Sequence, residues 1–386
     1  MLEKQVINKF LQQLEKVQYG SVGVTTPDGK EYYFTGNESA AHADLKIHDY
    51  RAITNLLAKG DIGFAESYRD GLFDSDNLEN LLTVALQNAN VMESYLYGGK
   101  FSGIMAQLLY YMRSNTLKGS RRNIKAHYDL GNDFYSVWLD PTMSYSAAIF
   151  KDENEPLIQA QHNKYDRIIN SLDTNSGSLL EVGCGWGGFA DRAVEKGDFA
   201  LKGITISQRQ YQYAKERLKN NADIVLEDYR KQEGKYDNIV SIEMFEAVGE
   251  KFWTTYFSKM KSLLSQKGKA VVQTITIDEQ YFERYRKTGD MVRSFIFPGG
   301  MLPSVTRFKQ EAAKEDLNVK YIHSFGQDYA KTLRHWSNSF ESNLPKIRKM
   351  GFDEKFIRLW RFYLCACTAS FTAGRTNVIQ AELSHA

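Results

Sequence analysis

The chain has 386 residues, a length that is typical of two domains at about 150 residues each. Hydrophobic residues make up 42% and charged residues 25%, so the composition is that of a globular protein and excludes an intrinsically disordered one. The net charge of only +2 excludes a general polyanion binder, and three cysteines are too few for a disulfide framework. The sequence has no CxxC or HExxH motif, so we expect no metal site.

The first elements predict a small α+β domain over residues 1–110. Residues 1–20 carry charges throughout and have the pattern of an amphipathic helix, not of a signal peptide. Two β-rich runs flank the turn sequence Pro27-Asp28-Gly29 and predict a hairpin, and helical periodicity follows at 50–58 and 78–86. No stretch approaches the roughly 18 apolar residues of a membrane span, so we expect a cytoplasmic protein.

A basic stretch follows, because residues 94–128 contain no Asp or Glu. One interpretation is an ordinary solvated surface. The other is a surface that binds an anionic membrane, where each basic residue contributes about 1 kcal/mol to the binding free energy. No nucleic-acid-binding motif accompanies the stretch, so no nucleic-acid partner is expected. Its basic residues are Lys100, Arg113, Lys118, Arg121, Arg122 and Lys125.

From about residue 111 to the end, strands and helices alternate. This alternation predicts a parallel sheet with helices on both faces. Residues 281–350 break the rhythm, and their Pro- and Gly-containing loop at 297–303 suggests an inserted lid. The predicted strands are 178–183, 200–207, 222–227, 236–244, 269–277, 319–325 and 376–383, with helices at 208–220 and 253–265.

A glycine-rich loop, EVGCGWGG at residues 181–188, joins a predicted strand to a predicted helix. Glycines let the backbone turn tightly and approach a ligand, and the helix N-terminus attracts an anion. Gly183, Gly185 and Gly188 satisfy GxGxxG, but a dinucleotide site also needs an acid about 20 residues later, and residues 203–211 contain none. The loop alone leaves hydride transfer and methyl transfer open.

The neighbouring motifs distinguish the two. The series EVGCGWGG, GITISQRQ, LEDYR and NIVSIEMFEAVG resembles S-adenosylmethionine (SAM) methyltransferases, and more narrowly the cyclopropane fatty acid synthase and mycolic acid cyclopropane synthase family. The segments at 127–135, 143–146, 325–333 and 361–371 resemble the same family, and 60–78 fits the small N-terminal domain of its bacterial members. The resemblance implies a Rossmann-like class I SAM methyltransferase fold with a lid insertion, over residues 111–386, beside the small N-terminal α+β domain.

The resemblance also implies where SAM binds. Its sulfonium is a cation, which aromatic faces attract by roughly 0.5–2 kcal/mol. Core packing is an equally simple interpretation of each tyrosine alone. The implied cofactor-binding residues are Tyr128, Tyr145, Ser146, Glu181, Gly183, Cys184 (through its backbone amide), Gly185, Gly187, Thr205, Ser207, Gln208, Gln210, Asp228 and Tyr229.

An alkene is a poor nucleophile, so its site must align it with the methyl group, exclude water and provide a base. In the family, a glutamate, a tyrosine, a histidine and backbone amides hold a bicarbonate ion that is thought to accept the proton. The glutamate maps to Glu246, which is otherwise read as a helix N-terminal acid, and the tyrosine maps to Tyr329. Gln273 stands where the family usually has His, and Gln cannot titrate.

Three further positions belong to this implied catalytic set. Ala147 replaces the usual Cys, whose contribution would come through the backbone, and the Ile275 amide would be another contact. Cys367 lies where the family has a cysteine sometimes designated catalytic. Its small apolar neighbours predict an inert buried thiol instead.

The resulting hypothesis is a cyclopropane-fatty-acyl-phospholipid synthase that uses SAM and bicarbonate. It would add a methylene across a cis double bond of a membrane phospholipid, work at the inner face of the membrane as a peripheral protein, and form a homodimer as the family suggests. The alternatives are an acyl-chain methyltransferase with a methyl-branched or hydroxylated product, an enzyme acting on a soluble thioester, a lipid-binding protein without turnover, and, more remotely, an NAD-dependent oxidoreductase.

Overall fold

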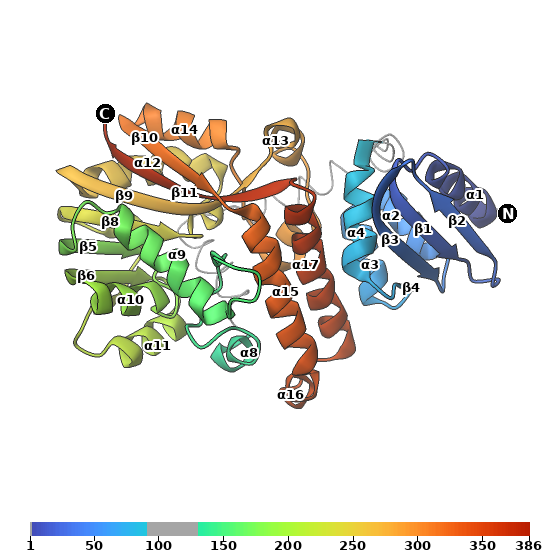
Figure 1. The fold of residues 1–386 in the computed structure, drawn as a ribbon, viewed down its shortest axis with the longest axis horizontal. Helices are drawn as coiled ribbons and strands as arrows, with labels where there is room; N and C mark the ends of the chain where they lie inside the picture. Colours follow the sequence, from blue (N-terminus) through green and yellow to red (C-terminus); the bar gives the residue numbers. More distant parts are fainter. Residues whose placement is uncertain (1, 91–129) are drawn as a thin grey trace. The chain divides into compact units, whose positions relative to one another are not determined.

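The computed structural model describes residues 2–90 and 130–386, which form two compact units (Figure 1). Of these residues, the first unit contains 2–90, 284–296 and 344–375, and the second contains the remainder. The basic stretch at 94–128, and with it Tyr128, lies outside the described residues. Within the described part of the chain, no helix has the length and apolar character that crossing a membrane requires.

The first unit is built on a four-stranded sheet with the order β2-β1-β3-β4. The predicted hairpin is confirmed, because β1 pairs antiparallel with β2 across the turn at Pro27-Asp28-Gly29, while β3 pairs parallel with β1. The strands are β1 (Tyr19–Thr25), β2 (Glu31–Thr35), β3 (Glu38–Ile47) and β4 (Phe73–Asp74). The helices are α1 (Leu2–Leu14), α2 (Arg51–Lys59), α3 (Asp61–Arg69), α4 (Leu78–Gln87), the π-helix η4 (Val292–Ile296), α16 (Leu344–Lys349) and α17 (Glu354–Thr372).

Hydrophobic periodicity in the sequence does not predict helix α3, because the helix is buried over most of its length and lacks a long polar face. Its Phe64 stacks on Phe73 with ring centroids 4.3 Å apart and meets Phe362 of α17 edge-on. The guanidinium of Arg358 in α17 lies 4.0 Å over the Tyr68 ring and donates to the backbone carbonyls of Tyr68 and Phe73. These contacts join a late helix to the N-terminal elements.

The second unit contains a seven-stranded sheet with the order β10-β11-β9-β8-β5-β6-β7. Strands β5 to β9 run parallel, and β11 pairs antiparallel with both β9 and β10, so the predicted α/β sheet is confirmed. The strands are β5 (Ser176–Val182), β6 (Asp198–Thr205), β7 (Asp223–Leu226), β8 (Tyr236–Ile242), β9 (Leu264–Ile277), β10 (Leu317–Ser324) and β11 (Thr376–His385).

Helices cover both faces of this sheet (Figure 1). On one face α9, α10 and α11 share a core with the strands, in which Ile168 and Phe189 pack with Leu179 and Val240. On the other face α12 and α14 pack around the buried ring of Phe245. The helices are α8 (Asn132–Ser136), α9 (Leu157–Ser171), α10 (Gly188–Lys196), α11 (Gln208–Leu218), α12 (Trp253–Leu263), α13 (Glu279–Tyr285), α14 (Val305–Lys314) and α15 (Gly326–Ser342), with 3₁₀ turns at Tyr229–Lys231 (η1), Phe245–Ala247 (η2) and Glu250–Phe252 (η3).

The segment expected to be an inserted lid, residues 281–350, is not a single block. Residues 284–296 group with the first unit, whereas 297–343 belong to the second and include β10, an edge strand of its sheet. The segment 344–375, which follows, also groups with the first unit. The chain therefore passes between its two units several times, which a sequence pattern does not reveal.

Candidate active site

The glycine-rich loop connects β5 to α10 at the carboxyl edge of the sheet, where open α/β sheets bind ligands. Gly183, Gly185 and Gly187 have φ values of +83°, +55° and +83°, which disfavour any other residue. A Cβ on Gly183 would lie 2.7 Å from Cγ of Met244, whereas a Cβ on Gly185 would meet no described atom within 4 Å. The backbone at Gly185 is therefore open to a ligand, as a cofactor-binding loop requires.

Cys184 does not offer the cofactor the amide expected from the sequence. Its backbone N–H donates to the carbonyl oxygen of Ile204 at 2.9 Å, an acceptor it shares with the N–H of Gly183. Burial, reinforced by the nearby Glu181, raises the pKa of the Cys184 thiol well above its usual value. The residue therefore packs the loop against β6 and contributes neither a free amide nor a thiolate.

The end of β6 and the segment that follows it bring together four predicted cofactor-binding residues. Thr205 Oγ1 donates to Gln210 Oε1 at 2.9 Å, and Ser207 Oγ accepts from the N–H of Gln210 as the N-cap of α11. Gln208 is exposed in the first turn of the same helix. This edge presents neutral polar groups to a ligand.

Asp228 and Tyr229 follow β7, one strand further along the sheet. The Asp228 carboxylate is buried and pairs with Arg230 at 2.7 Å, so its charge is neutralised within the protein. Burial raises the pKa of Tyr229 to about 12, so its ring carries a neutral hydroxyl. An ion-paired acid beside a neutral ring is suited to contact an uncharged base such as adenine.

A buried group of ionisable side chains lies beneath the loop. Glu181 is 3% exposed, its Oε2 has no hydrogen-bond partner in the described chain, and burial raises its pKa to about 8. The fully buried Lys164 donates to Ser146 Oγ at 2.7 Å and lies 4.0 Å from the centre of the Tyr165 ring. Burial lowers the pKa of Lys164 to about 7.

Aromatic rings gather around Tyr145, a predicted cofactor-binding residue. Its ring centroid lies 5.3 Å from Trp336, 5.4 Å from Tyr135, 5.5 Å from Trp138 and 6.1 Å from Phe297. Such a cluster excludes water and offers ring faces to a cation. It provides the apolar, cation-stabilising wall that alkene chemistry needs.

Three of the predicted catalytic residues converge on a carboxylate that sequence analysis did not identify, that of Glu243. Its Oε1 accepts hydrogen bonds from the backbone N–H of Ala147 and from Gln273 Nε2, each at 2.8 Å. Its Oε2 accepts from the hydroxyl of Tyr329 at 2.7 Å. Burial raises the pKa of Glu243, and these hydrogen bonds oppose that rise.

Glu246, which the family resemblance implies as a holder of bicarbonate, lies one turn further along the chain. Its Oε1 accepts from the backbone N–H of Ile275, and its Oε2 has no hydrogen-bond partner among the residues described. Burial, followed by the negative charge of Glu243, raises the pKa of Glu246 to about 8. At neutral pH Glu246 therefore holds its proton.

A second glutamine fixes the Gln273 amide. Gln380 is the direct partner of Gln273 across the β9–β11 pair, and its Nε2 donates to Gln273 Oε1 at 2.9 Å. Because that oxygen is occupied, the amide NH₂ of Gln273 must face Glu243. Sequence analysis missed Glu243, Gln380 and Lys164, and only Glu243 left a signal: it is an acid directly after a buried strand, three residues before Glu246.

Cys367 belongs to the first unit, in α17, whereas the other predicted catalytic residues belong to the second. Burial raises the pKa of its thiol to about 12. A thiol with such a pKa is not a nucleophile at neutral pH. The side chain is half-buried, not fully buried as its neighbours predict, and its raised pKa is that of an inert thiol.

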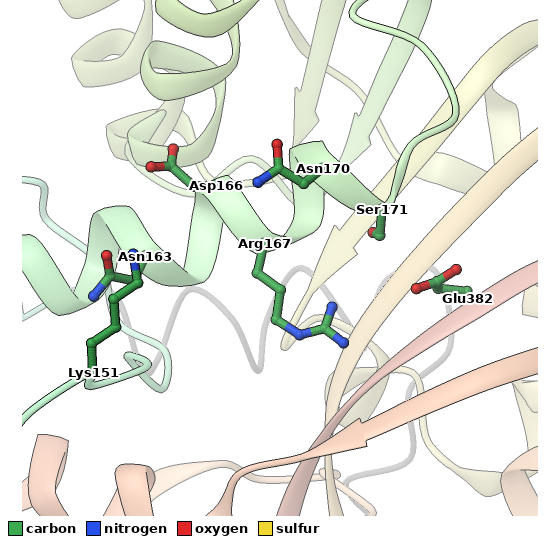
Figure 2. A pocket seen from close by; sticks show the side chains of 7 residues that line it. All are labelled: Lys151, Asn163, Asp166, Arg167, Asn170, Ser171 and Glu382. Atoms are coloured by element: carbon green, nitrogen blue, oxygen red, sulfur yellow. The ribbon is translucent and has the colours of Figure 1, made fainter.

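A pocket of about 380 Å³ lies elsewhere on the second unit, between α9 and β11 (Figure 2). It contains no aromatic ring and none of the predicted site residues, so it does not have the character of an acyl-chain site. It is lined by Lys151, Asn163, Asp166, Arg167, Asn170, Ser171 and Glu382.

Comparison with known proteins identifies similar sequences. The family model described as mycolic acid cyclopropane synthetase matches residues 115–381. The tuberculostearic acid methyltransferase UfaA1 of Mycobacterium tuberculosis is 32% identical over 372 residues, covering 90% of this chain and 84% of that protein. The cyclopropane-fatty-acyl-phospholipid synthase of Escherichia coli is 32% identical over 359 residues, covering 89% and 88% of the two chains.

Solved structures are similar as well. The mycolic acid cyclopropane synthase CmaA1, complexed with SAH and CTAB, has a TM-score of 0.64 and 32% identity, covering 68% of this chain and 97% of that one. Together with the strand order, this likeness confirms the Rossmann-like class I methyltransferase fold.

Proposed function

Since the chain belongs to the mycolic acid cyclopropane synthetase family and is a SAM-dependent methyltransferase, we propose that it is a cyclopropane-fatty-acyl-phospholipid synthase. It would transfer a methylene from SAM to a cis double bond in a phospholipid acyl chain. The observation that carries this proposal is the continuous arrangement in which Glu243 binds Tyr329, Tyr329 packs on Trp336, and Trp336 packs on Tyr145. A proton acceptor thus adjoins an apolar aromatic wall.

The residues present fit SAM. The open backbone at Gly185 would receive the amino-acid part, and the polar groups at the end of β6 would meet the ribose. Glu181 Oε2 has no hydrogen-bond partner among the described residues, and a bound cation would favour the ionised form of this carboxyl, so this part of the site suits a cationic ligand. SAM, when bound, supplies an electrophilic methyl group.

The acyl chain would lie against the rings around Tyr145. These rings exclude water from the reacting carbons and stabilise the positive charge that develops on the alkene. Backbone and side-chain contacts hold this wall in place before substrate binds: Gln161 Nε2 donates to the carbonyl of Ser146, and Thr332 Oγ1 accepts from the N–H of Ala148. A preorganised wall costs little reorganisation during the reaction.

Free bicarbonate, expected from the family resemblance, does not fit these residues. Its expected partners included the Ala147 amide, Gln273 and Tyr329, and all three donate to Glu243. The Ile275 amide donates to Glu246. We therefore route no step through bicarbonate.

A second candidate is acyl-chain methylation with a methyl-branched or hydroxylated product. The similarity to the tuberculostearic acid methyltransferase UfaA1, and to a probable fatty acid methyltransferase of Pseudomonas putida at 35% identity over 279 residues, favours keeping it. Both candidates begin with the same methyl transfer to an alkene. They differ in the reaction that removes the positive charge of the resulting carbocation.

Peripheral membrane docking through the first unit and the basic stretch at 94–128 is part of the proposal, because a phospholipid acyl chain must leave the bilayer to reach a buried site. The homodimer suggested by the family stays a prediction.

The test is to incubate the protein with SAM and vesicles of unsaturated phospholipid, and to measure S-adenosylhomocysteine release and the lipid mass. We expect a gain of one CH₂ per modified chain and no residual double bond at that position. Saturated phospholipid vesicles are the control, and a soluble unsaturated thioester tests the substrate class. A product that has gained a methyl branch or a hydroxyl would establish the second candidate, and no release with any unsaturated lipid would refute both.

A further inference from the structure

We infer that Glu243 is the built-in proton acceptor of this enzyme, and that its carboxylate replaces a free bicarbonate ion. The inference rests on the proposed function, because it concerns the proton that ring closure releases. It predicts that turnover does not depend on dissolved bicarbonate.

Three hydrogen-bond donors surround the Glu243 carboxylate. Two donors hold Oε1, the Ala147 amide and Gln273, and a single donor, Tyr329, holds Oε2. A carboxylate oxygen can accept two hydrogen bonds, so Oε2 keeps a lone pair for an incoming proton. The carboxylate is fixed in direction yet remains basic at one atom.

The groups that the resemblance implies for bicarbonate already have partners within the protein. The five groups expected to bind bicarbonate form two closed sets, one around Glu243 and one consisting of Glu246 with Ile275. A free anion would have to displace the Glu243 carboxylate from the Ala147, Gln273 and Tyr329 donors, and it would meet a second negative charge at Glu243. Repulsion between like charges in a buried site is costly, so the chain's own carboxylate excludes the external one.

The backbone at Glu243 is also unusual. Glu243 has a φ of +48°, a conformation that is rare for a residue with a Cβ. Its N–H donates to the carbonyl of Gln273 at 2.8 Å, which holds this conformation at the end of β8. Unfavourable conformations of this kind persist chiefly where a side chain must be placed for function.

The neighbouring groups cannot replace Glu243. Gln273 has no titratable proton site, and Tyr329 already donates its hydroxyl proton. Glu246 holds a proton at neutral pH, because burial and Glu243 raise its pKa to about 8. Glu243 is the carboxylate that its hydrogen bonds keep available.

The π electron pair of the alkene forms a bond to the transferred carbon while the carbon–sulfur pair leaves with sulfur, so a neutral thioether and a carbocation result. Oε2 of Glu243 takes one proton from the transferred carbon. The electron pair of that C–H bond then forms the second ring bond to the cationic carbon, and Glu243 later releases the proton to solvent.

The first experiment compares wild-type turnover on unsaturated phospholipid vesicles in buffer freed of CO₂ and in buffer with added bicarbonate. We expect equal rates. A wild-type enzyme that needs added bicarbonate would overturn the inference and leave the proposed function intact. A wild-type enzyme that is inactive in both buffers would instead count against the proposed function.

The second experiment uses variants. Glu243→Gln keeps the shape of the side chain and should lower kcat by about 10²–10⁴-fold with unchanged SAM affinity, which also reports correct folding. Glu243→Gly suits the positive φ and frees three donors, so added bicarbonate or formate should restore part of its turnover. The exposed Glu233→Gln is the matched control and should behave as wild type. Full turnover in Glu243→Gln, or an SAM-binding Glu243→Gly that neither anion rescues, would overturn the assignment.

Discussion

Glu243 and Glu246 lie three residues apart, but their surroundings give them different protonation states. Glu243 accepts hydrogen bonds from Ala147, Gln273 and Tyr329, whereas burial and the negative charge of Glu243 outweigh the hydrogen bonds to Glu246 and raise its pKa. Pairs of acids with separated pKa values are a recurring device of active sites. At the residue scale, this difference determines which group can accept a proton.

The raised pKa of Glu246 has a consequence for stability. Between the ordinary value of 4.5 and about 8, the unfolded chain ionises Glu246 while the folded protein keeps the proton, so the free energy of unfolding falls as pH rises through this window. Glu246→Gln removes this loss. We expect its Tm to match wild type near pH 4.5 and to exceed it by a few degrees near pH 8, measured by calorimetry. A constant Tm difference across this range would contradict the raised pKa.

The glycine loop allows a second prediction at this scale. Gly183→Ala places a Cβ 2.7 Å from Met244 Cγ in a backbone with φ of +83°, so it should shift the loop and weaken SAM binding by at least tenfold in calorimetric titration. Gly29→Ala is the control, because φ is +79° there and no described atom lies within 4 Å of its Cβ. That variant should lose about 1 kcal/mol of stability and bind SAM normally. Equal SAM affinity in both variants would remove Gly183 from the cofactor site.

At the scale of elements, the site depends on pairing between strands that are far apart in the sequence. Strand β11 comes after the chain has passed through the first unit, and it pairs between β9 and β10. Its register places Gln380 opposite Gln273. Gln380 does not bind Glu243 itself. It orients Gln273, which does.

Gln380→Leu tests this positioning role. Without the donor to its Oε1, the Gln273 amide can flip and present an oxygen to Glu243, so we expect kcat to fall by about tenfold or more while SAM affinity and lipid KM stay unchanged. Glu382→Gln on the same strand, which loses only an ion pair with Lys269 at 3.4 Å, is the control. A parallel loss in kcat and SAM affinity would indicate general damage to the sheet and contradict a positioning role.

At the scale of the whole molecule, the substrate of the proposed reaction is part of a membrane, and the basic stretch at 94–128 is the part of the sequence suited to meet it. Reversing Arg121 and Arg122 to Glu should weaken binding to anionic vesicles by about tenfold or more, with a larger effect at low salt. Reversal of the exposed Lys231 and Lys267 is the control for net charge. If both double variants sediment equally with vesicles, the stretch is an ordinary solvated surface.

The sequence by itself determined the alternation of strands and helices, the hairpin, the glycine loop and the family, because each depends on local periodicity, turn chemistry or ordered motifs. It also named Ala147, Gln273 and Tyr329 as groups that share one anion. Only the tertiary structure decided which anion these groups bind, because it places the Glu243 carboxylate within hydrogen-bond distance of all three. Glu243 reaches them from a left-handed backbone conformation at the end of β8, which the sequence pattern around a glutamate does not predict. The grouping of 284–296 and 344–375 with the first unit likewise depends on long-range packing, such as Arg358 on Tyr68, which local pattern cannot encode.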